Sequence, residues 1–162
     1  MDQLAAIRSN ETRERPTALD WDALIHKGRP RFVAAGVAQH GSKQVLLAED
    51  EPMVGNLMQQ LLHSWGYGVF SAGNGREAIE IAEEHKGPID LLVSDVTMPE
   101  MNGPELAKKL KTKRPRLQVI LLSGYSPTEI VLQQGWKFIQ KPFQMQDLRA
   151  AVEDIWKPES GL

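Results

Sequence analysis

From Gln44 onward, five short apolar runs alternate with amphipathic stretches at helical spacing. This alternation predicts repeated strand and helix units, which bury their apolar faces as a parallel sheet covered by helices. The predicted strands are 45–48, 68–71, 89–94, 118–123 and 137–140. The third and fourth are nearly continuous apolar runs, as expected for strands covered on both faces. We therefore expect an α/β domain with these two strands at the centre.

The first predicted helix follows the strand at 45–48. Pro52 falls where a first-turn proline is tolerated, and Met53, Leu57, Leu61 and Leu62 recur at helical spacing. We expect these four side chains to form the buried face of that helix.

Helix start signals also precede the later helices. Asn74 with Glu77, and Ser126 with Glu129, have the spacing of a capping box, and Pro104 falls at a predicted first helical position. A final helix over 145–156 is expected to bury Leu148, Val152 and Ile155 or Trp156.

Residues 1–42 do not follow the strand and helix pattern. We interpret them as an N-terminal extension, partly disordered, with a candidate short helix over 18–27 that places Trp21, Leu24 and Ile25 on one face. The main domain is predicted over 43–158, followed by a tail at 159–162. The extension could serve as a tether or a dimer contact, or could reflect where the gene was cut.

Composition narrows the class of protein. A chain of 162 residues that is 41% hydrophobic suits one ordinary α/β domain with additional length. A formal net charge of −2 without a polybasic segment indicates neither a nucleic-acid nor a membrane partner. The apolar runs are too short to span a bilayer and the N-terminus lacks signal-peptide features, so a soluble cytoplasmic protein is expected.

Polar side chains follow four of the five predicted strands. They are Glu49 and Asp50 after the first, Asp95 after the third, Ser123 at the end of the fourth, and Lys141 after the fifth. In an open parallel sheet, ligands bind outside the carboxyl ends of the strands, where these side chains are predicted to meet.

The expected cluster predicts a metal site and a nucleophile. Three converging carboxylates repel one another unless a cation compensates them. The chain has no cysteine, so a metal would be held by oxygen or imidazole ligands, and Mg²⁺ prefers carboxylate and phosphate oxygens. Asp95 could then attack a phosphorus atom, while Lys141 and the Ser123 hydroxyl contact phosphoryl oxygens.

The sequence resembles the receiver domain of two-component response regulators over about residues 43–156. The resemblance rests on the motifs VLLAEDEP, WGY, AGNGREA, DLLVSDVTMPEMNG, LLSG and FIQKPF. The last two are most similar in style to receivers of hybrid sensor histidine kinases. The family implies a flavodoxin-like, doubly wound, five-stranded parallel sheet with strand order 2-1-3-4-5.

The resemblance also implies roles for the site residues. Asp95 would be the phosphoacceptor, and Asp50 and Asp95 would bind Mg²⁺ directly, with Mn²⁺ as an alternative ion. Glu49 would act through a metal-bound water, and the Thr97 backbone carbonyl would complete the protein ligands. The Thr97 side chain would also tune the lifetime of the phosphorylated state.

The resemblance further implies which residues change position when Asp95 is phosphorylated. Ser123 takes the hydroxyl switch position, Phe138 the aromatic switch position and Lys141 the phosphate-contacting position, followed by a cis bond to Pro142. The spacing from Ser123 to Lys141 is about four residues shorter than usual in the family. We therefore expect the helix between them to lose roughly one turn.

The function implied is that of a phosphoacceptor in a His-Asp phosphorelay, with no enzymatic activity beyond self-phosphorylation and autodephosphorylation. A sensor histidine kinase or a histidine phosphotransfer protein would supply the phosphoryl group. Because the chain ends at Leu162, output is expected through contact with a downstream protein, from a monomer or a phosphorylation-dependent dimer. A phosphorylation-independent docking module, or a phosphate sink detached from a hybrid kinase, remains an alternative.

Two other classes fit the residues less well. A haloacid-dehalogenase phosphatase also uses an aspartate nucleophile and Mg²⁺, but it requires a second aspartate two residues later, where this chain has Thr97. A flavin-binding electron carrier would hold a phosphate in its first loop, which Glu49, Asp50 and Glu51 would repel.

Overall fold

The structure is a computed structural model that describes residues 42–125 and 134–157. The predicted helix over 18–27, the Ser126–Glu129 capping box, the shortened helix before the last strand and the tail lie outside the described residues.

Five parallel strands form a single sheet in the order β2-β1-β3-β4-β5. They are β1 (Gln44–Ala48), β2 (Gly68–Ala72), β3 (Leu91–Asp95), β4 (Gln118–Ser123) and β5 (Lys137–Gln140). The predicted strand order is confirmed. The third strand is central as expected, whereas β4 and β1 lie on either side of it. The structure begins β3 two residues later than predicted, at Leu91, although Ile89 is buried.

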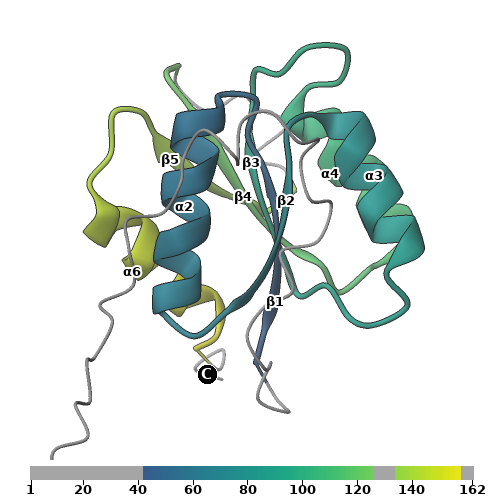
Figure 1. Cartoon of the computed structure of the whole chain (residues 1–162), viewed down its shortest axis with the longest axis horizontal. Coiled ribbons are helices and arrows are strands. Elements are labelled where there is room, and N and C mark those ends of the chain that lie inside the picture. The colour runs from purple at the N-terminus through teal and green to yellow at the C-terminus, as the bar shows by residue number, and fades with distance from the viewer. Residues whose placement is uncertain (1–41, 126–133, 158–162) are drawn as a thin grey trace, which may run out of the picture. The chain divides into compact units, whose positions relative to one another are not determined.

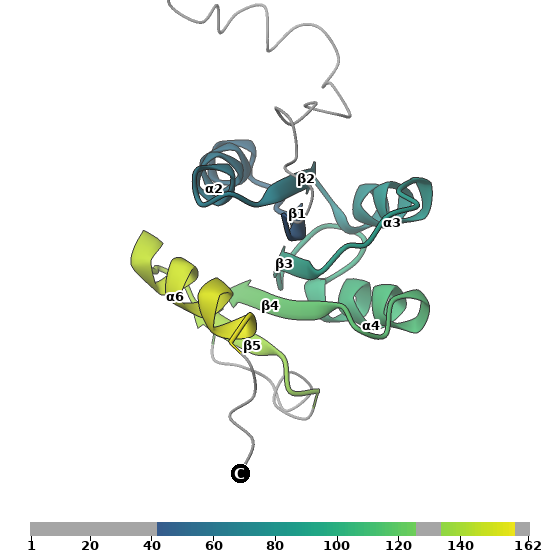
Figure 2. The same ribbon diagram turned by 90° about the horizontal axis from the view of Figure 1, so that it is seen from below.

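Helices cover both faces of this sheet. On one face lie α2 (Pro52–Ser64) and α6 (Met145–Ile155), and on the other lie α3 (Gly75–Glu84) and α4 (Gly103–Lys113) (Figures 1 and 2). Alternate strand residues enter two separate core clusters, because successive side chains of a strand point to opposite faces. The arrangement is the predicted doubly wound α/β fold.

The predicted buried face of α2 is wrong in part. Met53 is 81% exposed and Leu57 is 54% exposed, whereas the buried residues are Gly55, Met58 and Leu62. Residues three and seven apart share one side of a helix, so Gly55 begins the buried stripe. The apolar residues of α2 surround much of the helix, and the sequence pattern did not identify which side meets the sheet.

Capping also differs from the prediction in detail. Asn74 accepts a hydrogen bond from the Glu77 backbone N–H, but the Glu77 carboxylate accepts from the residue before the cap instead of completing the box. A full capping box occurs at Asn102 and Glu105, and it makes Pro104 the second residue of α4 instead of the first. This box fixes where α4 begins, directly after the loop that follows β3.

Candidate functional site

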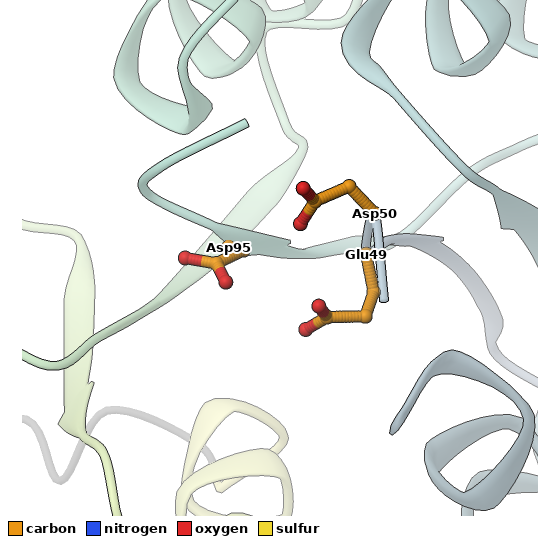
Figure 3. Close-up of side chains that lie close together, drawn as sticks. All are labelled: Glu49, Asp50 and Asp95. Carbon is orange, nitrogen blue, oxygen red and sulfur yellow. The ribbon is translucent and has the colours of Figure 1, made fainter. Parts of the chain in front are cut away.

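Three carboxylates meet at the carboxyl ends of β1 and β3. One oxygen from each of Glu49, Asp50 and Asp95 lies within 4.8 Å of the others. Figure 3 shows Glu49 and Asp50 following one strand and Asp95 at the end of its neighbour. Parallel pairing of β1 with β3 brings these two strand ends side by side. The structure therefore gathers the predicted acidic residues in one place.

A lysine from the fifth strand end joins this cluster. The Lys141 Nζ donates to Asp95 Oδ2 at 2.6 Å and to Glu49 Oε2 at 3.2 Å. The backbone N–H of Lys141 donates to the Ser123 carbonyl at 2.7 Å, and the peptide bond to Pro142 is cis. Residues that are far apart in the chain are thus held together by the ends of the strands.

The donor set fits a divalent hard cation. With all groups ionised, three carboxylates and one ammonium give a formal charge of −3 + 1 = −2, which one Mg²⁺ would balance. All three acidic side chains offer oxygen atoms, the ligands that Mg²⁺ prefers. Asp50 is exposed, so one side of the cluster is open to water, and Mg²⁺ usually keeps several waters.

Burial alters the electrostatics of two of these groups. Burial disfavours the Lys141 ammonium, but its hydrogen bond to Asp95 and the charge of Glu49 outweigh that effect, so the pKa of Lys141 is raised. Glu49 is only 4% exposed, and burial raises the pKa of its carboxyl. The Glu51 backbone N–H and the Lys141 ammonium offset this rise in part.

The raised pKa of Glu49 predicts a pH dependence of stability. Above its ordinary value of 4.5, the folded state holds this proton more tightly than the unfolded state. The free energy of unfolding of the metal-free wild type should therefore fall, relative to Glu49→Gln, as pH rises from 4.5 through the folded pKa. Urea unfolding in EDTA at a series of pH values measures this difference. A relative gain in stability of the wild type over the same range would contradict the assignment.

The predicted switch residues, Ser123 and Phe138, lie on the neighbouring strands β4 and β5. Ser123 is buried at the end of β4, and its Oγ accepts a hydrogen bond from the Tyr125 backbone N–H at 3.1 Å. Phe138 on β5 pairs in register with Leu121 and packs, half-buried, against one core cluster. Ser123 therefore lies at the strand end beside the acidic residues, whereas Phe138 is the second of the four residues of β5.

Thr97 lies in the loop after β3. Its side chain is exposed, and its backbone N–H donates to Asp95 Oδ1 at 3.0 Å. Together with the Lys141 contact to Oδ2, this bond engages both oxygens of the Asp95 carboxylate. The proposed use of the Thr97 carbonyl as a metal ligand stays a prediction.

Sequence reasoning overlooked a polar residue inside β3. Ser94 is fully buried, and its hydroxyl donates to the backbone carbonyl of Asp95 at 2.9 Å. The available signal was a serine within an otherwise apolar strand, directly before the candidate nucleophile. Gly103 is the first residue of α4 and lies against the same carbonyl.

The chain belongs to the response regulator receiver domain family, whose model matches residues 45–153. Receiver domains are signalling modules of two-component systems that interact with histidine kinases or phosphotransfer proteins. The resemblance predicted from the sequence motifs is therefore confirmed at the level of the family.

Relatives support this assignment and include the hybrid-kinase type. The chain is 40% identical over 119 residues to sensor kinase CckA of Brucella abortus, a match that covers 71% of this chain but only 13% of the kinase. It is 32% identical over 117 residues to the response regulator receiver protein CpdR of Brucella abortus, covering 70% of this chain and 96% of that protein.

Solved structures show the same fold. The receiver domain of hybrid histidine kinase CckA matches with a TM-score of 0.62 and 37% identity, covering 70% of this chain and 99% of that domain. The response regulator TrrA of Thermotoga maritima, solved in complex with Mg²⁺-BeF, matches with a TM-score of 0.62 and 30% identity, covering 70% and 98%. Within residues 42–125 and 134–157, no helix is long and apolar enough to cross a membrane.

Proposed function

We propose that this protein is a phosphoacceptor in a His-Asp phosphorelay, and that phosphorylation of Asp95 switches a protein-interaction surface. The observation that carries the proposal is the Asp95 carboxylate, held by Lys141 at 2.6 Å beside two further carboxylates. A carboxylate with a neighbouring cation and room for a metal is equipped to act as a nucleophile. Cytoplasmic location is part of the same proposal.

In this proposal Glu49, Asp50, Asp95 and the Thr97 carbonyl hold Mg²⁺, with Mn²⁺ able to occupy the same oxygen ligands. The cation would neutralise negative charge on the transferring phosphoryl group. Glu49 is nearly buried and bonded to Lys141, which supports its acting through a water instead of as a direct ligand. Asp50, which is exposed, is the more accessible direct ligand.

The chemical step uses the chain's own residues in defined roles. An Asp95 carboxylate oxygen forms a bond to phosphorus as the donor's bond to phosphorus breaks, and the donor group leaves with the electron pair. Lys141 already contacts Asp95 and can hold an oxygen of the arriving phosphoryl group. The Ser123 hydroxyl is proposed to hold another oxygen, and Thr97 to control how readily water reaches the phosphorus.

Exposed apolar side chains support recognition of a protein partner. Met53 and Leu57 on α2, Met145 on α6 and Tyr125 after β4 are the exposed large hydrophobic residues of the described chain. The helix α2 contains no Asp, Glu, Lys or Arg, and depletion of charge is typical of the centre of a protein interface. We propose a sensor histidine kinase or a histidine phosphotransfer protein as phosphodonor.

The remaining assignments follow from this proposal. We place the receiver domain at 43–158, with 1–42 as an N-terminal extension and 159–162 as a tail. Ser123 and Phe138 are proposed to transmit phosphorylation to the surface around β4 and β5, in a monomer or a phosphorylation-dependent dimer. The downstream target would be reached by protein contact.

Incubation with acetyl phosphate tests the proposal without a cognate kinase. With Mg²⁺, intact-mass measurement should show the gain of one phosphoryl group, and EDTA should prevent it. Amide hydrogen exchange of β4 and β5 should change in the phosphorylated fraction. A chain that gains no phosphoryl mass is no phosphoacceptor, and a chain that is phosphorylated without any change in exchange favours the phosphate-sink alternative over the switch.

A further inference from the structure

Ser94 is a buried polar residue in the strand that presents Asp95. It is 0% exposed, as are its strand neighbours Leu92 and Val93, and its hydroxyl donates to the Asp95 backbone carbonyl at 2.9 Å. A hydroxyl removed from water costs free energy unless it forms a hydrogen bond. This hydroxyl meets that requirement through the backbone of the candidate nucleophile.

The first residue of α4, Gly103, lies against the same carbonyl oxygen. A Cβ at Gly103 would lie 2.3 Å from the Asp95 carbonyl oxygen and 3.1 Å from the Ser94 Oγ. Real Cβ atoms do not approach a backbone oxygen this closely, so only glycine lets the first residue of α4 lie here. The Gly103 N–H also donates to the Val96 carbonyl at 2.9 Å. The start of α4 and the Ser94 hydroxyl therefore both lie against the Asp95 carbonyl.

This carbonyl belongs to the peptide that joins Asp95 to Val96. The Val96 N–H at the other side of that peptide donates to the Leu122 carbonyl at 2.8 Å, which anchors it to β4. One residue later, the Thr97 N–H donates to Asp95 Oδ1. A rotation of this peptide would therefore displace both Asp95 and the Thr97 backbone. It would also disturb the hydrogen bond from the Thr97 N–H to the Asp95 carboxylate.

We propose that Ser94 is a positioning residue for the acidic site, whose hydroxyl fixes the Asp95 peptide and through it the direction of the Asp95 carboxylate. The consequence for phosphoryl transfer rests on the function proposed above. Ser94 is not a catalytic residue, because its buried hydroxyl is bonded to the backbone carbonyl and not to the reacting carboxylate. Its effect should appear both in cation binding and in the rate of phosphorylation.

Ser94→Ala tests this role against a core truncation on the same strand, Val93→Ala. We expect Ser94→Ala to weaken Mg²⁺ binding several-fold in amide NMR titrations and to lower the phosphorylation rate constant, at saturating Mg²⁺ and acetyl phosphate, about tenfold. Val93→Ala should lower the urea midpoint more, because it removes buried methyl groups, yet leave both functional values near those of the wild type.

The two variants separate positioning from stability. Wild-type Mg²⁺ affinity and rate in Ser94→Ala would overturn the proposal, as would losses in both variants that scale with their urea midpoints. Ser94→Cys, with a weak donor of similar shape, should give intermediate values and keeps the test available if the alanine variant does not fold. If the wild type is not phosphorylated at all, the proposed function fails, while the Mg²⁺ titration still decides the positioning role.

Discussion

Asp95→Asn is expected to abolish phosphorylation by acetyl phosphate. The amide that replaces the carboxylate has nearly the same shape but lacks the charged oxygen that attacks phosphorus. Folding should persist, because the change removes one of three mutually repelling carboxylates and leaves an oxygen that can still accept from the Thr97 N–H. Intact-mass measurement with Mg²⁺ should therefore show no phosphoryl gain in a folded variant.

Asp90→Asn provides a matched control for this variant. Asp90 precedes β3 at its opposite end, where its carboxylate accepts from the Gln44 backbone N–H and pairs with Lys43. The same chemical change is thus made near the same strand but away from the acidic cluster. The control should be phosphorylated like the wild type, and equal phosphorylation of Asp95→Asn would place the acceptor elsewhere.

Asp50→Asn is expected to raise the dissociation constant for Mg²⁺ at least tenfold, which corresponds to about 1.4 kcal/mol of binding free energy. The variant lowers the formal charge of the cluster from −2 to −1 and removes the exposed carboxylate proposed as a direct ligand. Because Mg²⁺ depends on a small number of carboxylate ligands, one such loss should have a large effect. Amide NMR titration with MgCl₂ measures the affinity.

Glu51→Gln is the control for the Mg²⁺ experiment. Glu51 is the next acidic residue in the chain and is exposed, and the group of side chains able to hold a metal does not include it. Both variants remove one negative charge at nearly the same place, so a long-range effect of net charge would weaken binding in both alike. Equal affinities of Asp50→Asn and wild type would remove Asp50 as a ligand.

Much of the fold could be predicted because the apolar runs and the turn signals place the strands and helices at the same positions in the sequence. The bounds of β4 and β5 match the prediction, since Ser123 ends the first run and Lys141 directly follows the second. The buried side of α2 was not predictable in the same way, because Met53 and Leu57 are as apolar as the residues that face the sheet. Strand order came from the family resemblance and not from periodicity.

The positions of the strand ends in the sequence predicted which residues meet in the site, but not which hydrogen bonds they form. Parallel strands bring Glu49, Asp50, Asp95 and Lys141 to one edge, so their convergence could be predicted from positions in the sequence. Lys141 bridges two carboxylates because its side chain is long enough to reach both. The hydrogen bond from the Ser94 hydroxyl to the Asp95 carbonyl depends on the local direction of the backbone. A pattern of residues in the sequence specifies neither of these features.

The central claim is that Asp95 itself carries the phosphoryl group, and chemical trapping tests it most directly. Borohydride reduces an acyl phosphate to an alcohol, which converts a phosphorylated aspartate into homoserine. After treatment with Mg²⁺ and acetyl phosphate, trapping and peptide mass spectrometry should find homoserine at position 95 of the wild type. Homoserine at position 50 or 90, or none in a chain that has gained phosphoryl mass, would contradict the assignment.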